Sequence, residues 1–331
     1  MKRREFITLV GGAAAASVFW PLTARAQQAG KIARVGVLAS DRGNPITGEG
    51  LQILSAELRK LGFIEGQNLV VEHRRVDEGA AKAFTGANEL VAAKADVLVV
   101  SGAELGLQAA VAARPPVPIV MLANNIDPIM RGYVKSLSHP GGNITGMFFR
   151  QPELAAKQME LLAEAFPGRK RIAVLWDQTS VDLLDSAERA AQLLGLSLRP
   201  LKLENPPYDW DATFRTLMER EAQMLHVLSS PQFTPHRSRI AELALRHRLP
   251  SMYIFKYYVT AGGLMSYGVD TGPMWRRAAS YVAKILRGAQ PADLPVEQAS
   301  SFELALNLKT AKALGLELPT SILLRANEVI E

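Results

Sequence analysis

Short apolar runs alternate with segments of amphipathic helical spacing along most of the chain. Residues 34–40 are apolar up to a final serine, which is typical of a strand buried on both faces of a parallel sheet. Leu51, Leu54, Leu58 and Leu61 then recur at three- and four-residue spacing, which indicates an amphipathic helix. The pattern continues with predicted strands at about 69–75, 96–100 and 117–121 and predicted helices at about 81–94 and 103–113. Such repeated strand–helix–strand units predict a doubly wound parallel sheet.

A second series of the same kind begins at residue 171. Residues 171–175 (RIAVL) resemble residues 34–38 (RVGVL), and each run opens a strand–helix–strand–helix–strand unit. The further predicted elements are helices at about 182–194, 211–221, 236–247 and 274–287 and strands at about 196–203, 223–228, 251–254, 263–267 and 301–306. The late segments are too many for the second unit alone, so we expect some of them to return to the first and to make a hinge of several segments.

The fold class expected from this pattern is α/β, with two doubly wound, Rossmann-like lobes. We assign residues 27–148 and about 271–295 to the first lobe. Residues 149–270 and about 296–331 form the second.

The first 26 residues have the three parts of an export signal. Arg3 and Arg4 lie in a basic start, an apolar run of about a dozen residues follows, and Ala-Arg-Ala at 24–26 precedes Gln27. The apolar run is shorter than the roughly 20 residues needed to cross a bilayer. We therefore expect export to the periplasm with cleavage near Ala26, and no membrane span in the mature chain. The arginine pair favours the twin-arginine route, and the alternative is a general secretory leader that happens to begin with two arginines.

Composition excludes several kinds of chemistry. The 331 residues contain no Cys, which removes disulfides, zinc–thiolate sites, iron–sulfur clusters and thiol nucleophiles. The net charge is +6, and roughly half of that surplus lies in the leader. No Lys/Arg cluster is interleaved with aromatic residues, so we expect no binding of nucleic acid.

Motifs for cofactors and catalysis are also missing from the sequence. The nearest dinucleotide-binding candidate, Gly48-Glu-Gly50, lacks the third glycine because position 53 is Ile. There is no phosphate-binding loop and no Gly-x-Ser-x-Gly nucleophile turn, and the five His residues lack metal-ligand spacing. We expect no cofactor, no metal and no catalytic residue.

What the sequence does offer is a set of polar residues at the carboxyl ends of predicted strands, where open α/β sheets place their ligands. These candidate ligand-binding residues are Ser40, Ser101, Gly102, Ala103, Asn124 and Asp127 in the first lobe and Asp177, Thr179, Ser229, Ser230, Tyr253 and Asp270 in the second. The alternative for each of them is a helix cap or a turn former, which are common roles of Ser, Asp and Asn at strand ends.

Several segments closely resemble the ABC-transporter substrate-binding protein family that includes tryptophan- and tyrosine-type binding proteins. They are EGQN at 65–68, HPGGNITG at 139–146, HRLPSMY at 247–253, AGGLMSYG at 261–268 and NLKTAKALGL at 307–316. The resemblance runs essentially from end to end. It implies a type I periplasmic-binding-protein fold with three crossovers, whose lobes close around a small molecule, an amino acid or related small carboxylate, for delivery to an ABC permease in the inner membrane. It implies no catalysis, and we expect a monomer.

The resemblance also implies roles for individual residues. In amino-acid-binding relatives, the loop corresponding to 101–103 and the turn at 127–128 line the cleft opposite Asp177, Ser229 and Asp270. Two departures from the family pattern allow a ligand other than an aromatic amino acid: Ala103 stands where a hydroxyl residue is common, and residues 124–125 are Asn where small residues are usual.

An amino-acid ligand would need both of its charges compensated when it is buried. In that case we expect Asp270 to receive the cationic group, and Ser101 with neighbouring backbone N–H groups to hold the carboxylate. The alternative for Asp270 is that it caps a helix beginning near Pro273. Two other functions stay open: an exported enzyme on the same frame, and a ligand-sensing module for a membrane receptor.

Overall fold

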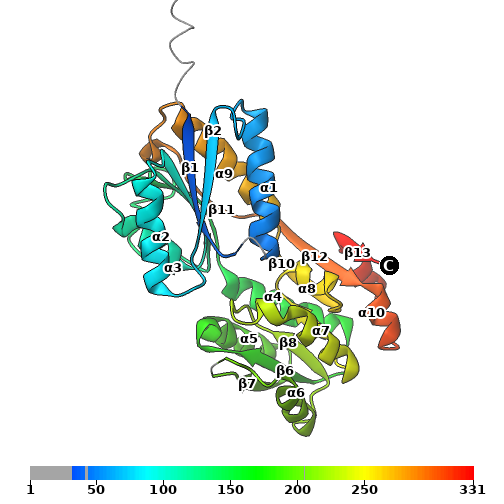
Figure 1. The fold of residues 1–331 in the computed structure, drawn as a ribbon. Helices are drawn as coiled ribbons and strands as arrows, with labels where there is room; N and C mark the ends of the chain where they lie inside the picture. The colour runs from blue at the N-terminus through cyan, green and yellow to red at the C-terminus, as the bar shows by residue number, and fades with distance from the viewer. Residues whose placement is uncertain (1–31, 42–43, 205) are drawn as a thin grey trace, which may run out of the picture.

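The computed structural model describes residues 32–41, 44–204 and 206–331 of the chain. One parallel sheet and one mostly parallel sheet form the centres of two lobes (Figure 1). The doubly wound two-lobe fold expected from the sequence is confirmed. The predicted export signal, residues 1–26, lies outside the described residues.

The first lobe is built on a six-stranded sheet. Its strands are β1 (Ala33–Ala39), β2 (Leu69–Arg75), β3 (Val97–Gly102), β4 (Ile119–Asn124), β5 (Ile144–Phe149) and β11 (Val296–Gln298). They lie in the order β11-β5-β4-β3-β1-β2, and every pair is parallel. Valines, leucines and isoleucines fill both faces, as the continuous apolar runs predicted.

Four helices cover this sheet. They are α1 (Pro45–Lys60), α2 (Ala80–Ala92), α3 (Glu104–Ala112) and α9 (Thr271–Leu286). In Figure 1, α1 and α9 lie on one side of the sheet and α2 and α3 on the other. Asn44 caps α1 by accepting the Ile46 N–H at 3.0 Å, and Pro45 takes the first helical position, so the helix begins where the sequence favours it.

The second lobe is built on a seven-stranded sheet in the order β13-β12-β10-β9-β8-β6-β7. Its strands are β6 (Arg171–Trp176), β7 (Ser197–Lys202), β8 (Met224–Val227), β9 (Ser251–Tyr253), β10 (Met265–Val269), β12 (Phe302–Asn307) and β13 (Glu328–Ile330). Within both sheets only the pair β10–β12 is antiparallel among the described strands. The strands are therefore mostly parallel in this lobe too.

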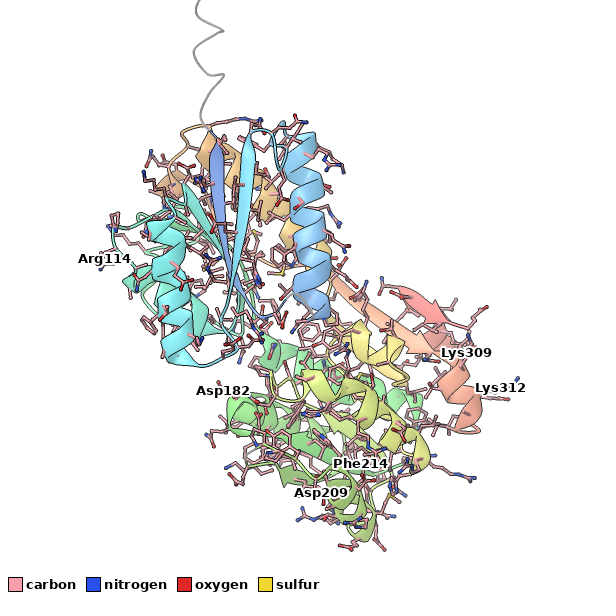
Figure 2. The ribbon with its side chains drawn as sticks, viewed as in Figure 1. Arg114, Asp182, Asp209, Phe214, Lys309 and Lys312 are labelled. Atoms are coloured by element: carbon pink, nitrogen blue, oxygen red, sulfur yellow. The ribbon has the colours of Figure 1, made fainter. Side chains whose placement is uncertain are left out.

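The helices of the second lobe are α4 (Gln151–Ala165), α5 (Val181–Leu193), α6 (Trp210–Glu219), α7 (Arg237–Arg246), α8 (Lys256–Thr260), α10 (Leu308–Ala313) and α11 (Thr320–Leu323). Figure 2 shows Asp209 and Phe214 at α6, at the end of this lobe that lies away from the first. Asp209 caps α6, and the Phe214 ring is buried and stacks on His247 at 5.7 Å. Lys309 and Lys312 extend outward from α10 (Figure 2).

The chain crosses between the sheets three times. The crossings lie between β5 and α4, between β10 and α9, and between β11 and β12. One boundary differs from the sequence analysis, which started the last segment of the second lobe at about 296. Residues 296–298 form β11 and pair with β5, so this crossing comes after Gln298. A strand of three residues is too short to show a hydrophobic pattern, so the sequence did not predict that β11 pairs with β5.

Candidate functional site

The carboxyl ends of the first lobe's strands point toward the second lobe (Figure 1). Ser40 follows β1, Ser101 and Gly102 end β3, and Asn124 ends β4. β3 lies between β1 and β4 in the sheet, so these candidate residues come together at one edge. Ser40 is half-buried, and its carbonyl oxygen lies 2.9 Å from Nε2 of His73.

The start of α3 combines backbone N–H groups with a carboxylate of its own. Ser101 is buried. Gly102 has a φ of +116°, a backbone conformation that favours glycine. Ala103 is the exposed N-cap residue of α3, and its side chain makes no capping hydrogen bond. Glu104 occupies the first turn and accepts a hydrogen bond from the Tyr133 hydroxyl at 3.0 Å. Burial, together with Glu104, raises the pKa of Tyr133 to about 12. A ligand anion at this helix start would therefore meet an existing negative charge.

One buried residue that was not predicted from the sequence links the two rims. Gln151, the first residue of α4, donates its backbone N–H to Oδ1 of Asn125 at 3.3 Å. Its side-chain Nε2 donates to Oγ of Ser229, which follows β8, at 3.3 Å. Asn125 itself has a φ of +57° and donates its N–H to the Phe149 carbonyl at 2.9 Å. These contacts hold the first crossing, between β5 and α4, against residues that follow β4 in the first lobe and β8 in the second.

Three of the second-lobe candidates form one hydrogen-bonded group. Asp177, 4% exposed after β6, accepts from the Ser230 hydroxyl at 2.5 Å and from the backbone N–H and hydroxyl of Thr179 at 2.9 and 2.6 Å. Ser180, not predicted, completes a capping box with Asp177. These contacts use both carboxylate oxygens. Asp177 therefore shapes this rim by capping.

Two other acidic candidates also act as turn or cap residues. Oδ1 of Asp127 accepts the N–H groups of Ile129 and Met130 at 3.1 and 3.0 Å. Oδ1 of Asp270 accepts the Gly272 N–H at 2.9 Å and caps α9. The cap predicted as the alternative for Asp270 is therefore present, while a role toward a ligand stays a prediction.

Tyr253 is a candidate whose side chain lies in the core. Its side chain has no exposed surface and stacks on Tyr258 with ring centroids 4.7 Å apart. Its hydroxyl has no hydrogen-bond partner within the part of the chain that the structure describes. The strand ends at Tyr253 as expected, but this residue points into the core because successive side chains alternate between faces.

A cavity of about 310 Å³ lies beside the hinge, between the two lobes. It lies between the first turn of α1 and the segment around α8, and Val269 and Thr271 of the second crossing also line it. None of the twelve candidate residues is among its lining residues. Phe255, Lys256 and Tyr257 line this cavity and follow β9 closely in the chain. Counting residues just beyond Tyr253 as strand-end candidates would therefore have identified the cavity.

A larger cavity, about 1020 Å³, lies at the other end of the first lobe. Its lining includes Ala33 at the start of β1, Asp96 before β3 and Pro118 before β4. It is therefore at the amino-terminal edge of the sheet, away from the edge where α/β folds place ligands.

The described ranges contain no group of three or more His, Asp or Glu residues arranged to hold a metal ion. None of the helices in those ranges is long and apolar enough to span a membrane.

Comparison with known proteins extends over most of the chain. The sequence profile of the family "ABC transporter substrate binding protein" matches residues 45–330. A tyrosine-binding protein of Clostridioides difficile (strain R20291) is 24% identical over 264 residues, covering 78% of this chain and 74% of that protein.

Two solved structures are similar over 90% of this chain. A conserved domain protein from Vibrio cholerae O1 biovar eltor has a TM-score of 0.79 and 27% identity over 100% of its own chain. An ABC domain in complex with L-Trp from Streptococcus pneumoniae has a TM-score of 0.76 and 26% identity over 99% of its chain.

Proposed function

The chain belongs to the ABC transporter substrate-binding protein family, and from this premise we propose that it is the exported, periplasmic solute-binding component of an ABC importer. Its ligand is an amino acid or a related small carboxylate, held between the lobes. The relatives that bind tyrosine and L-Trp support this ligand class.

The observation that carries the proposal is the meeting of two polar strand-end rims across a hinge. Ser101 and Asn124 lie on the rim of the first lobe, and Ser229 and Ser230 lie on that of the second. Gln151 bonds to residues on both sides where the chain crosses. A ligand that contacts both lobes favours their closed arrangement, because it gains contacts there that it lacks when they are apart.

The family is one of solute-binding proteins rather than enzymes. For this chain we propose binding without catalysis. Delivery to a permease follows from the proposed role.

Closure and ligand class can be tested on the purified mature protein. A thermal-shift screen of the twenty L-amino acids and small carboxylates should find a ligand that raises Tm. Binding stabilises the folded state by mass action, by about 2.7 kcal/mol at a hundredfold excess over Kd. Small-angle scattering with that ligand should show a smaller radius of gyration. A higher Tm at an unchanged radius would contradict closure, and no stabilising compound would contradict the ligand class.

A further inference from the structure

The hinge cavity contains a cation without an acidic partner. Arg237, the first residue of α7, donates from Nη1 to the Thr234 carbonyl at 3.2 Å and lies 6.0 Å above the centre of the Tyr257 ring. No carboxylate lies within ion-pair distance of it among the residues described. Arg239 on the same helix is different, because it pairs with Asp211 and Glu242 at 2.6 and 2.9 Å.

The other lysine or arginine in the cavity wall is already compensated. Nζ of Lys256 lies 3.8 Å from carboxylate oxygens of both Glu303 and Glu328. Arg237 is therefore the cation of this wall that is available to an incoming anion.

An unpaired carboxylate faces the same space from the first lobe. Glu49 is exposed in the first half of α1 and lines the cavity, and it forms no ion pair with any described residue. Burial lowers the pKa of Lys256, but the nearby carboxylates of Glu303, Glu328, Glu49 and Asp270 raise it above its usual value, so four carboxylates surround this one ammonium group. Burial raises the pKa of Glu303, and Asp270, Glu328 and Glu49 add to that rise while Lys256 opposes it. This part of the cavity favours a positive group.

The cavity wall also includes aromatic and apolar residues. The rings of Phe255 and Tyr257 stack at 5.3 Å with an interplanar angle of 21°. A contact of 3.3 Å between the Tyr257 hydroxyl and Thr234 holds the second ring in place. Pro45 and Ile46 of α1 line the cavity from the first lobe.

We infer that this cavity binds a zwitterion, with Arg237 holding the carboxylate, Glu49 the ammonium group, and the rings of Phe255 and Tyr257 a flat or apolar side chain. The inference rests on the proposed function and deepens it: the ligand is an α-amino acid that spans the hinge. A guanidinium offers a carboxylate two parallel hydrogen bonds. This assignment moves the carboxylate from Ser101, where Glu104 would repel it, to the second lobe. Glu49 and Arg237 belong to different lobes, so the ligand ties the lobes together.

The test compares matched substitutions by isothermal titration. Each L-amino acid that binds the wild type, with L-tryptophan, L-tyrosine, L-phenylalanine and L-leucine tested first, is compared with its amide and its deaminated acid. Arg237→Gln should weaken amino-acid binding at least 30-fold, with little effect on the amide, which has no carboxylate. Glu49→Gln should weaken amino-acid binding about tenfold, with little effect on the deaminated acid. Arg239→Gln and Glu57→Gln, on the same two helices outside the cavity, should stay within twofold of the wild type.

Arg237→Lys serves as a check on folding, because it keeps the charge and loses the two-pronged donor. It should bind between the wild type and Arg237→Gln. If Arg237 has only a structural role, Arg237→Gln should weaken binding of the amino acid and of its amide equally. That result would overturn the inference. If Arg237→Gln binds L-amino acids as the wild type does, the inference also fails while the proposed function stands. If the wild type binds no amino acid and no deaminated acid, the proposed ligand class fails and the inference fails with it.

Discussion

At the scale of single residues, His226 has the most strongly perturbed imidazole in the described part of the chain. It lies fully buried in β8, with Nε2 2.7 Å from Oε1 of Gln158, and Gln158 in turn donates to the Tyr267 carbonyl at 2.6 Å. Burial lowers the pKa of His226 to about 3, so the ring is neutral at pH 7. In the unfolded chain it would titrate near 6.5. Between these two values the unfolded state binds more protons, so stability falls as pH falls.

Replacing His226 with Gln should remove this part of the pH dependence. The wild type should lose about 2 kcal/mol of unfolding free energy between pH 7 and pH 5 through this group alone. His226→Gln lacks a titrating group there, so its loss over the same interval should be smaller by that amount. Urea unfolding of both proteins at the two pH values measures the difference. Equal losses would show that His226 is protonated in the folded state or is exposed to solvent.

Asp270 has two possible roles, which one substitution separates. Asp270→Asn keeps a side-chain oxygen that can cap α9 through the Gly272 N–H but removes the negative charge. If the Asp270 carboxylate receives the ligand's cationic group in place of Glu49, affinity should fall by about 2 kcal/mol or more with Tm nearly unchanged. Titration of the screened amino acid and a thermal melt measure the two effects. Unchanged affinity would leave only the cap.

The sequence predicted that polar residues lie at the strand ends, but not whether each one caps a turn or contacts a ligand. Asp177 and Asp127 satisfy backbone N–H groups of their own turns, and the same side chains in the same places could equally face a ligand. Gln151 and Arg237 were missed because each one begins a helix instead of ending a strand. Their importance depends on contacts between segments far apart in sequence.

At the scale of elements, α1 and α9 pack so closely that the contact requires a glycine. A Cβ placed on Gly50 would lie 2.1 Å from the ring of Trp275, which is 1% exposed and has no room to move. Gly50→Ala should therefore destabilise the protein by about 1–3 kcal/mol, although alanine is the better helix former by about 1 kcal/mol. Ser55→Ala on the same helix is the control and should change stability little. Chemical denaturation measures both, and a stabilised Gly50→Ala would show that the two helices can move apart.

Long apolar runs and regular helical spacing predicted most elements to within a few residues. The elements that were not predicted are α4, α8, α10, α11, β11 and β13. α8 consists of Lys-Tyr-Tyr-Val-Thr, residues that mostly favour strands, and its helical form depends on the stacking of Tyr257 and Tyr258 against the core. β13 has three residues, too few to show a period.

At the scale of the whole molecule, export can be tested independently of binding. We predict that residues 1–26 are removed in the periplasm, and mass spectrometry of periplasmic protein should give a mature start near Gln27. A start before about residue 20 would contradict this cleavage site. Replacing Arg3 and Arg4 with Lys should block export if the route is twin-arginine. Normal periplasmic levels of that variant would point to the general route.

Because α9 and β11 follow most of the second lobe in the chain, the first lobe cannot finish folding until most of the second lobe has been synthesised. A ribosome has made the first five strands of that lobe by residue 149, but the helix that covers one face of the sheet ends at residue 286 and the edge strand at 298. At roughly 5–20 residues per second, the stretch from residue 149 to residue 286 takes about 7–27 seconds to make, and during this time Leu54 and Leu58 of α1 lack the helix they pack against. A chain interrupted after the second lobe's first strands would keep that apolar face open. The apolar face of α1 is therefore uncovered on the nascent chain throughout this interval.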